Sequence, residues 1–288
     1  MSTLPRPTRK NDVIDKLEYA EEQRNELARA LFDSYETEEL PKFVSMRAEG
    51  VLSNARECFD YLAHDLIEGY LIPQATAKFV ERYKQGKEKT YFPFYVDQLT
   101  KAQWPWHQFK AVEASVFEHL SGFIDAMDKR LLIGCTLFAA RDFRVVQEMV
   151  NEKKHSNVVQ YHAVADAAVF HKGRAGSVVL DKATAGLAGF EIGPEFRGDN
   201  PKSVPEFRFV SNSRNVLKLC LFAVVATRTV MDWWYETHFH PTENRINPDT
   251  IMMDNGIPSE RPMWTYEPGV NTQTSKDSLS FAMRVQVR

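Results

Sequence analysis

The chain has 288 residues, of which 43% are hydrophobic and 26% are charged, and its formal net charge is −3. This composition is typical of a folded globular protein, and the length allows one large domain or two smaller ones. The slight negative charge excludes a surface that is basic overall, so any binding of nucleic acid would need a local basic patch.

The cysteines and the N-terminus bear on where the protein works. Cys58, Cys135 and Cys220 are far apart and form no zinc-binding or disulfide pattern. We expect reduced, mostly buried thiols in a cytoplasmic protein. Residues 1–10, a flexible terminus in this interpretation, contain no apolar signal-peptide core. The most apolar run, 219–226, is too short to cross a bilayer, so we expect no membrane partner.

Apolar periodicity predicts several helices along the chain. The clearest pattern surrounds Phe59, where apolar side chains fall within about 60° of one helical face at 100° per residue. Asn212 or Ser213 is a candidate N-cap for the last helix. The members of the apolar face are Leu52, Ala55, Leu62, Ala63, Leu66 and Tyr70. The predicted helices are 11–34, 42–70, 108–127, 130–155 and 213–239.

The pattern changes to short β-rich runs after His155, with a glycine-containing turn at 172–176. The predicted fold is therefore mainly α with a β insertion. Helices from 11–155 and 213–240 form a bundle, and 156–212 forms a small antiparallel β module before the last long helix. Residues 241–288 show little periodicity and are interpreted as an irregular tail.

Arg56 and Asp60 are i, i+4 neighbours at the edge of the apolar face of one predicted helix. The planar guanidinium of an arginine can bind a phosphate or a carboxylate, and Asp60 could hold Arg56 in place. The alternative is an ordinary surface ion pair, which contributes roughly a few tenths of a kcal/mol.

A second polar group, Asn151, Lys154 and His155, stands at the end of the helix predicted at 130–155. Histidine exchanges a proton near neutral pH, and a neighbouring cation can stabilise a developing anion. The alternative is a solvated last turn, where lysine and histidine are favoured by the helix dipole.

Taken together, the two groups resemble a bacterial family of HEPN-like helical proteins. The matching positions are Asn54, Arg56, Asp60, Phe92, Pro93, Asn151, Lys154 and His155. Active HEPN members are metal-independent ribonucleases or RNA-binding partners in toxin and phage-defence systems. The resemblance implies an antiparallel helical bundle that acts on RNA as a homodimer and needs no cofactor.

The resemblance also assigns roles to the matching side chains. Arg56 and His155 would be catalytic, whereas Asn54, Asp60, Asn151 and Lys154 would bind or orient the substrate. The usual HEPN pattern, Arg-x4–6-His on one helix, is absent: seven residues separate Arg56 from His64. The alternative hypothesis is a non-catalytic bundle protein that acts through a protein partner and whose polar residues are structural.

No metal site is expected from the histidines near the end of the last helix. His238 and His240 are two residues apart, a spacing that places side chains together on a strand but not on a helix.

Overall fold

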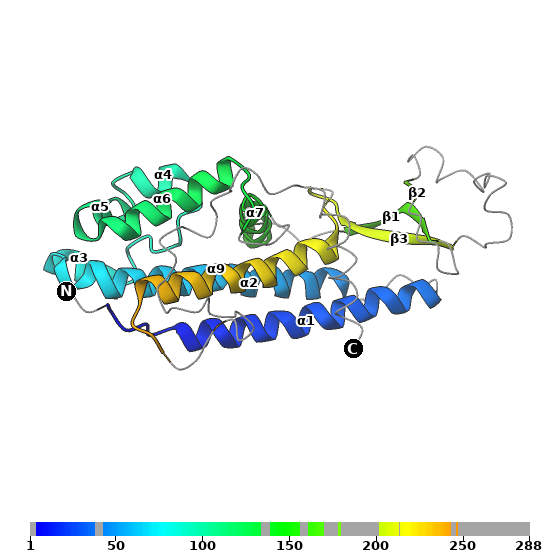
Figure 1. Ribbon diagram of the computed structural model, residues 1–288, viewed down its shortest axis with the longest axis horizontal. Helices are drawn as coiled ribbons and strands as arrows, with labels where there is room; N and C mark the ends of the chain where they lie inside the picture. Colours follow the sequence, from blue (N-terminus) through cyan, green and yellow to red (C-terminus); the bar gives the residue numbers. More distant parts are fainter. Residues whose placement is uncertain are drawn as a thin grey trace, which may run out of the picture. The chain divides into compact units, whose positions relative to one another are not determined.

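Most of the described residues belong to α-helices in the computed structural model of the chain (Figure 1), so the prediction of a mainly helical protein is confirmed. The structure describes residues 4–37, 43–133, 139–155, 161–169, 178–179, 202–212, 214–242 and 246. The chain divides into two compact units. The first comprises Met1–Ile14, Glu57–Val145 and Val225–Arg288, and the second comprises Asp15–Arg56 and Val146–Val224.

Most of the segments with apolar residues at helical spacing form helices in the structure. The predictions at 11–34, 42–70, 108–127 and 213–239 correspond to α1, α2, α5 with α6, and α9. The α-helices are α1 Lys10–Thr37, α2 Val44–Leu66, α3 Ala77–Lys84, α4 Val96–Thr100, α5 Phe109–Val112, α6 Ala114–Asp128, α7 Asp142–His155 and α9 Val216–His238. A π-helical turn, Ile67–Leu71, continues α2, and 3₁₀ turns cover Ile72–Gln74 and Pro105–Gln108.

The helix predicted at 130–155 is wrong in its first half, because α7 begins only at Asp142. Arg130 has a left-handed φ of 57°, and the N–H of Leu131 donates back to the carbonyl of Ala126 at 2.9 Å. This is a typical helix end, and it terminates α6. The N-cap of α9 is Asn215 rather than the predicted Asn212 or Ser213, because the side chain of Asn215 accepts the N–H of Lys218 at 2.9 Å.

The core of the first unit is aromatic. Phe59 of α2 lies 5.1 Å, centroid to centroid, from both Phe92 and Phe94, with the rings edge-on. Phe123 of α6 and Phe143 of α7 complete the group, and Phe143 is also 5.1 Å from Phe59. Each buried phenylalanine contributes about 1.5–3 kcal/mol, and edge-to-face pairs add to this. This cluster holds the 92–94 segment against α2.

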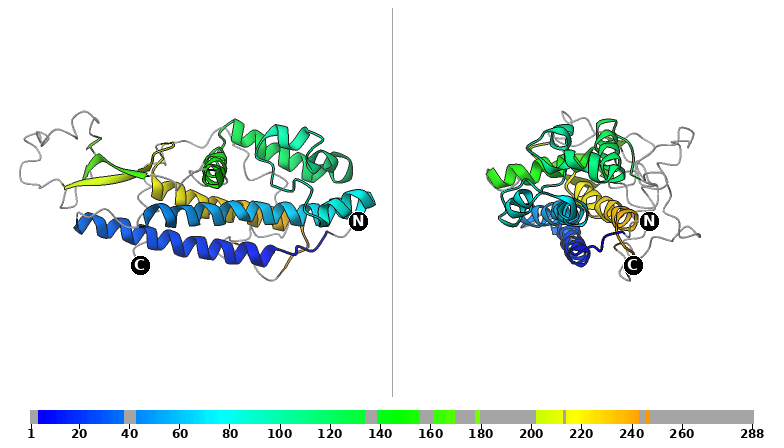
Figure 2. Two further views of the ribbon diagram at one scale, coloured as in Figure 1. Left: turned by 180° about the vertical axis from the view of Figure 1, so that it is seen from behind. Right: turned by 90° about the vertical axis from the view of Figure 1, so that its left-hand side faces the viewer.

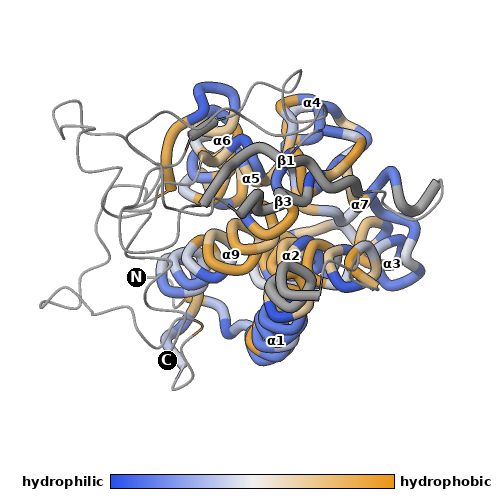
Figure 3. Tube along the Cα trace, turned by 90° about the vertical axis from the view of Figure 1, so that its right-hand side faces the viewer, coloured by the Kyte–Doolittle hydropathy of each residue, from blue (hydrophilic) through white to orange (hydrophobic). Residues whose placement is uncertain are grey.

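The second unit pairs α1 with the first half of α2, which run side by side in Figures 1 and 2. Apolar side chains at helical spacing are buried from both, including Leu17, Leu27 and Leu52. Figure 3 shows α1 as mostly hydrophilic along its length and α9 as mostly hydrophobic. Helix α1 is therefore amphipathic, with one buried apolar face, whereas α9 is apolar over most of its surface.

Three strands also belong to the second unit: β1 Tyr161–Val169, β2 Val178–Val179 and β3 Lys202–Phe209. They form an antiparallel sheet in the order β2-β1-β3. Tyr161 pairs with Phe209, and the register shifts between Ala165 and Ala167. The predicted turn at 172–176 and nearly all of the predicted tail at 241–288 lie outside the described residues. None of the helices described is both long and apolar enough to cross a membrane.

Candidate functional site

Asn54 connects α2 to α1 within the second unit. It is buried, its carbonyl oxygen accepts from Nζ of Lys16 at 3.2 Å, and its amide donates to Oε1 of Gln23 at 3.2 Å. Gly50 makes room for this contact, because a Cβ at that position would meet Oε1 of Gln23 at 2.5 Å. The Asn54 amide therefore serves helix packing in this structure.

Arg56 is buried on α2 with 6% relative exposure, deeper than the edge position expected from its sequence spacing. It belongs to the second unit, together with Asn54 and with the part of α7 that follows Val145. Buried guanidinium groups are held by their surroundings, which limits the directions in which they can donate hydrogen bonds.

Asp60 lies in the first unit, one helical turn beyond Arg56. Its Oδ1 accepts the backbone N–H of Phe92 at 3.3 Å. A carboxylate on a backbone N–H is a charge-assisted hydrogen bond, and this one holds the aromatic segment at the start of the Phe-Pro-Phe sequence. Two positions of the family pattern, Asp60 and Phe92, thus contact each other.

The other predicted cluster stands on the last turns of α7. Asn151 is exposed, and α7 ends at His155, as the sequence pattern requires. The side chains of Lys154 and His155 lie outside the described residues. The helical backbone places Asn151 and His155 one turn apart on the same face.

A more strongly bonded cluster surrounds Asp65, which the sequence analysis did not single out. We use the name Asp65 cluster for Thr8, Arg9, Asp65, Glu68 and Tyr235. Asp65 has a fully buried side chain and accepts from the N–H and the hydroxyl of Thr8, from Arg9 and from the hydroxyl of Tyr235. Both terminal nitrogens of Arg9 bind Glu68 at 2.7 Å. These bonds anchor the N-terminal residues to α2 and the π-turn.

The Asp65 cluster continues to a tyrosine and a histidine. The hydroxyl of Tyr83 donates to Glu68 at 2.7 Å and lies 2.8 Å from Nδ1 of His64. The hydrogen bond from Arg9 lowers the pKa of Glu68, while burial lowers the pKa of His64. Burial also raises the pKa of Tyr83 above its usual value. In the sequence, the only indication of this cluster was Asp65, a charged residue next to apolar residues of the same helix. Its partners Thr8 and Arg9 are more than fifty residues away.

A histidine pair joins α6 to the end of α9. Nδ1 of His119 lies 2.8 Å from Nε2 of His238, and His238 is buried. Burial, followed by the influence of His119, lowers the pKa of His238 to about 3. His240 is exposed; its Nδ1 lies 3.0 Å from the carbonyl oxygen of Pro241, and its backbone N–H donates to the carbonyl of Pro5 at 2.8 Å. No group of three or more potential metal ligands occurs in the part of the chain that the structure describes.

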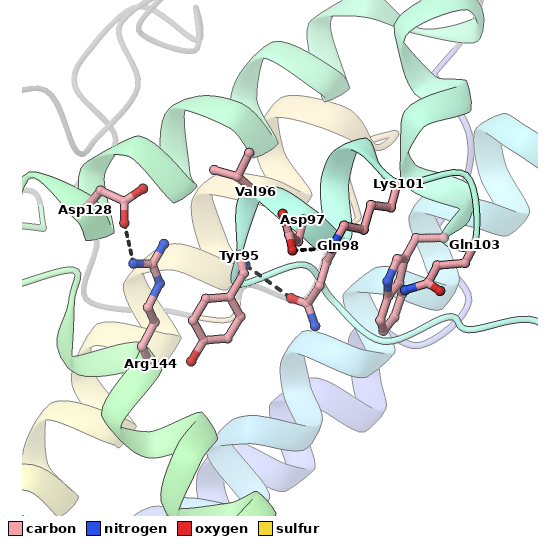
Figure 4. Close-up of a pocket in the computed structure, with 9 residues that line it drawn as sticks. Tyr95, Val96, Asp97, Gln98, Lys101, Gln103, Asp128 and Arg144 are labelled. Atoms are coloured by element: carbon pink, nitrogen blue, oxygen red, sulfur yellow. Dashed lines mark hydrogen bonds and ion pairs between the residues drawn. The ribbon is translucent and has the colours of Figure 1, made fainter.

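The first unit also has an open hollow of about 520 Å³, lined by residues of the 95–104 segment together with Asp128 and Arg144. In Figure 4, Arg144 and Asp128 lie on one side of Tyr95, whereas Gln98, Lys101 and Gln103 lie on the other. The guanidinium carbon of Arg144 is 4.9 Å from the centroid of the Tyr95 ring. Cation–π contacts of this kind hold an arginine in a defined plane.

Comparison with known proteins adds no relative: no family model matches the chain, and no curated protein or solved structure matches it significantly.

Proposed function

We propose that this chain is a HEPN-like helical protein that cleaves RNA without a metal ion. The observation that carries the proposal is that Arg56 and the end of α7, with His155, belong to one compact unit. The burial of Arg56 supports it further, because a catalytic cation must be held in a fixed position. In this proposal the helices of 11–155 and 213–240 form the bundle, and β1–β3 are an insertion.

The proposed reaction needs a base and a cation. His155 takes the proton of a ribose 2′-hydroxyl, and the 2′-oxygen attacks the adjacent phosphorus. The bond between phosphorus and the 5′-oxygen breaks, and that oxygen takes a proton from water. Arg56 stabilises the additional negative charge on the phosphate oxygens. The products are a 2′,3′-cyclic phosphate and a 5′-hydroxyl end.

The remaining matched residues support these two. Lys154 adds positive charge beside His155, and Asn151 is exposed one helical turn earlier, where it can contact RNA. Asn54 and Asp60 orient α2 through their hydrogen bonds to α1 and to Phe92. A homodimer and a role in a toxin or phage-defence system are part of the same proposal.

A second candidate function is a non-catalytic helical protein that works through a protein partner. The observation that favours it is that the side chains of Asn54 and Asp60 form hydrogen bonds within the chain that serve packing. In this case Arg56 is a buried structural group, and its removal would cost stability rather than activity.

The test is cleavage of labelled RNA in excess EDTA by the wild type and by Arg56→Ala, Arg56→Lys and His155→Ala. The proposal predicts cleavage by the wild type and a loss of about 100-fold or more in kcat for each alanine variant. Arg56→Lys keeps the charge but loses the planar guanidinium, so its kcat should lie between those of the wild type and Arg56→Ala. Failure of the wild type to cleave, or unchanged rates in both alanine variants, contradicts the proposal.

Matched controls separate chemistry from folding. Arg47→Ala removes a half-exposed arginine from the same helix, where it pairs with Glu26 at 3.6 Å. His240→Ala removes an exposed histidine beyond α9. Both controls should retain wild-type cleavage. Thermal unfolding of every variant then shows whether Arg56→Ala loses activity while still folded.

A further inference from the structure

The open hollow beside Tyr95 has the volume of a small-molecule site, since ligand pockets commonly enclose about 300–1,000 Å³. Its lining combines aromatic rings with amide and guanidinium donors. Tyr95 and Trp104 are both half-buried, so each keeps part of its ring surface accessible.

Arg144 is fixed at one edge of the hollow. Its Nε donates to the carbonyl of Phe94 at 2.8 Å, and its Nη1 forms an ion pair with Asp128 (Figure 4). Only 16% of the Arg144 side chain is exposed. Within the described part of the chain, Nε and Nη1 each donate one hydrogen bond, so the two N–H groups of Nη2 and the second N–H of Nη1 are the remaining donors of this guanidinium.

Gln98 is fixed as well. Its Oε1 accepts the backbone N–H groups of Phe94 at 2.7 Å and Tyr95 at 3.1 Å, so the orientation of the amide is determined. The amide nitrogen consequently points away from that backbone, as Figure 4 shows. The hollow thus has N–H donors at two places whose orientation is set before a ligand binds.

The charged side chains that line the hollow balance one another, and outside this lining Nζ of Lys89 lies 5.3 Å from the centroid of the Trp104 ring. Lys101 is paired with Asp97, and Arg144 is paired with Asp128. A site with neutralised charges does not select a phosphate group by its charge. Flat aromatic faces with fixed N–H donors instead suit an uncharged heteroaromatic ring that carries hydrogen-bond acceptors.

We propose that this hollow binds a nucleobase of single-stranded RNA, with the base against the Tyr95 and Trp104 rings and an acceptor of the base on the amide N–H of Gln98. The proposal rests on the RNA-cleaving function proposed above and names how that substrate is held. Every base has a π-face, so stacking gives affinity with little sequence preference. The acceptor that bonds to Gln98 adds a modest preference among bases.

The test measures binding and cleavage of a short labelled single-stranded RNA by Trp104→Ala and Trp104→Phe. Binding is measured in the His155→Ala background, and cleavage in the wild-type background. Trp104→Ala should weaken binding about 10-fold and raise KM with kcat nearly unchanged, and Trp104→Phe should restore most of the affinity. Tyr91→Ala is the matched control, because Tyr91 is an exposed aromatic residue of the same segment outside the hollow.

The outcomes distinguish the two proposals. If the wild type cleaves RNA but Trp104→Ala binds and cleaves like Tyr91→Ala, the hollow is not a base site and the catalytic proposal stands. If RNA is bound through Trp104 but not cleaved, the base site stands and the catalytic proposal fails. If the wild type neither binds nor cleaves RNA, both fail. Thermal unfolding of Trp104→Ala and Trp104→Phe confirms that the effects are measured on folded protein.

Discussion

Helix α2 carries two polar side chains that the protein uses in different ways. Asp65, near its C-terminal end, is fully enclosed and accepts hydrogen bonds from an arginine, a threonine and a tyrosine. Asn54, nearer its middle, makes two hydrogen bonds of 3.2 Å with side chains of α1. The difference indicates that stability depends most on a buried charge with several hydrogen-bond donors, rather than on a side chain in a recognisable motif.

The largest expected effect is that of Asp65→Ala. This change leaves the hydroxyl of Tyr235 and the N–H groups of Thr8 and Arg9 without their acceptor. We expect the free energy of unfolding to fall by about 3 kcal/mol, as for other broken buried pairs. Urea unfolding measures this loss, with Asp60→Ala, which removes the 3.3 Å hydrogen bond to the N–H of Phe92, as the comparison variant. Equal losses in the two variants would contradict a greater contribution of Asp65 to stability.

The histidine pair predicts an intermediate effect that depends on pH. The pKa of His238 is about 3 in the folded protein, because burial disfavours the charged ring. It is about 6.5 in an unfolded chain. The contribution of neutral His238 to the free energy of unfolding is therefore complete above pH 6.5. It is lost as the pH falls toward 3, because the unfolded state then binds a proton that the folded state does not.

His238→Gln removes this titration. The stability advantage of the wild type over the variant should shrink by about 2 kcal/mol between pH 7 and pH 5. Urea unfolding at both pH values measures the change. An advantage that stays constant between these pH values would show that His238 is not held neutral.

The smallest effect is expected for Asn54→Ala, which should cost about 1 kcal/mol. Gly50→Ala pushes the amide of Gln23 away from its position, so it disturbs the same hydrogen bond. The two substitutions should therefore be non-additive, and the double variant should lose less stability than the sum of the single variants. Simple additivity in a double-mutant cycle would mean that Gln23 does not couple Gly50 to Asn54.

Local patterns predicted much of the helical structure. The apolar face around Phe59 is buried as expected, apart from the half-buried Tyr70, because 3.6-residue periodicity directly reports which side of a helix packs. The left-handed break at Arg130 was missed, since an arginine carries no signal for positive φ. The Asp65 cluster and the His119–His238 pair were missed because their partners are distant in sequence and meet only through the tertiary fold.

The candidate site was predictable in part for the same reason. Spacing correctly placed Arg56 and Asp60 on α2, and Asn151 and His155 on the last turns of α7. It did not indicate that Asn54 would bond to α1 or that Asp60 would hold the N–H of Phe92. The hollow beside Tyr95 was also unforeseen, because it needs Arg144 to bond to Phe94, which is 50 residues earlier in the sequence.

The most direct test of the central claim uses a DNA oligonucleotide that contains a single ribonucleotide, incubated in EDTA with the wild type and with His155→Ala. We expect the wild type to cut only after the ribonucleotide, leaving a 2′,3′-cyclic phosphate and a 5′-hydroxyl, and His155→Ala to be at least about 100-fold slower. An uncut oligonucleotide, other end groups, or equal cleavage by His155→Ala would contradict it.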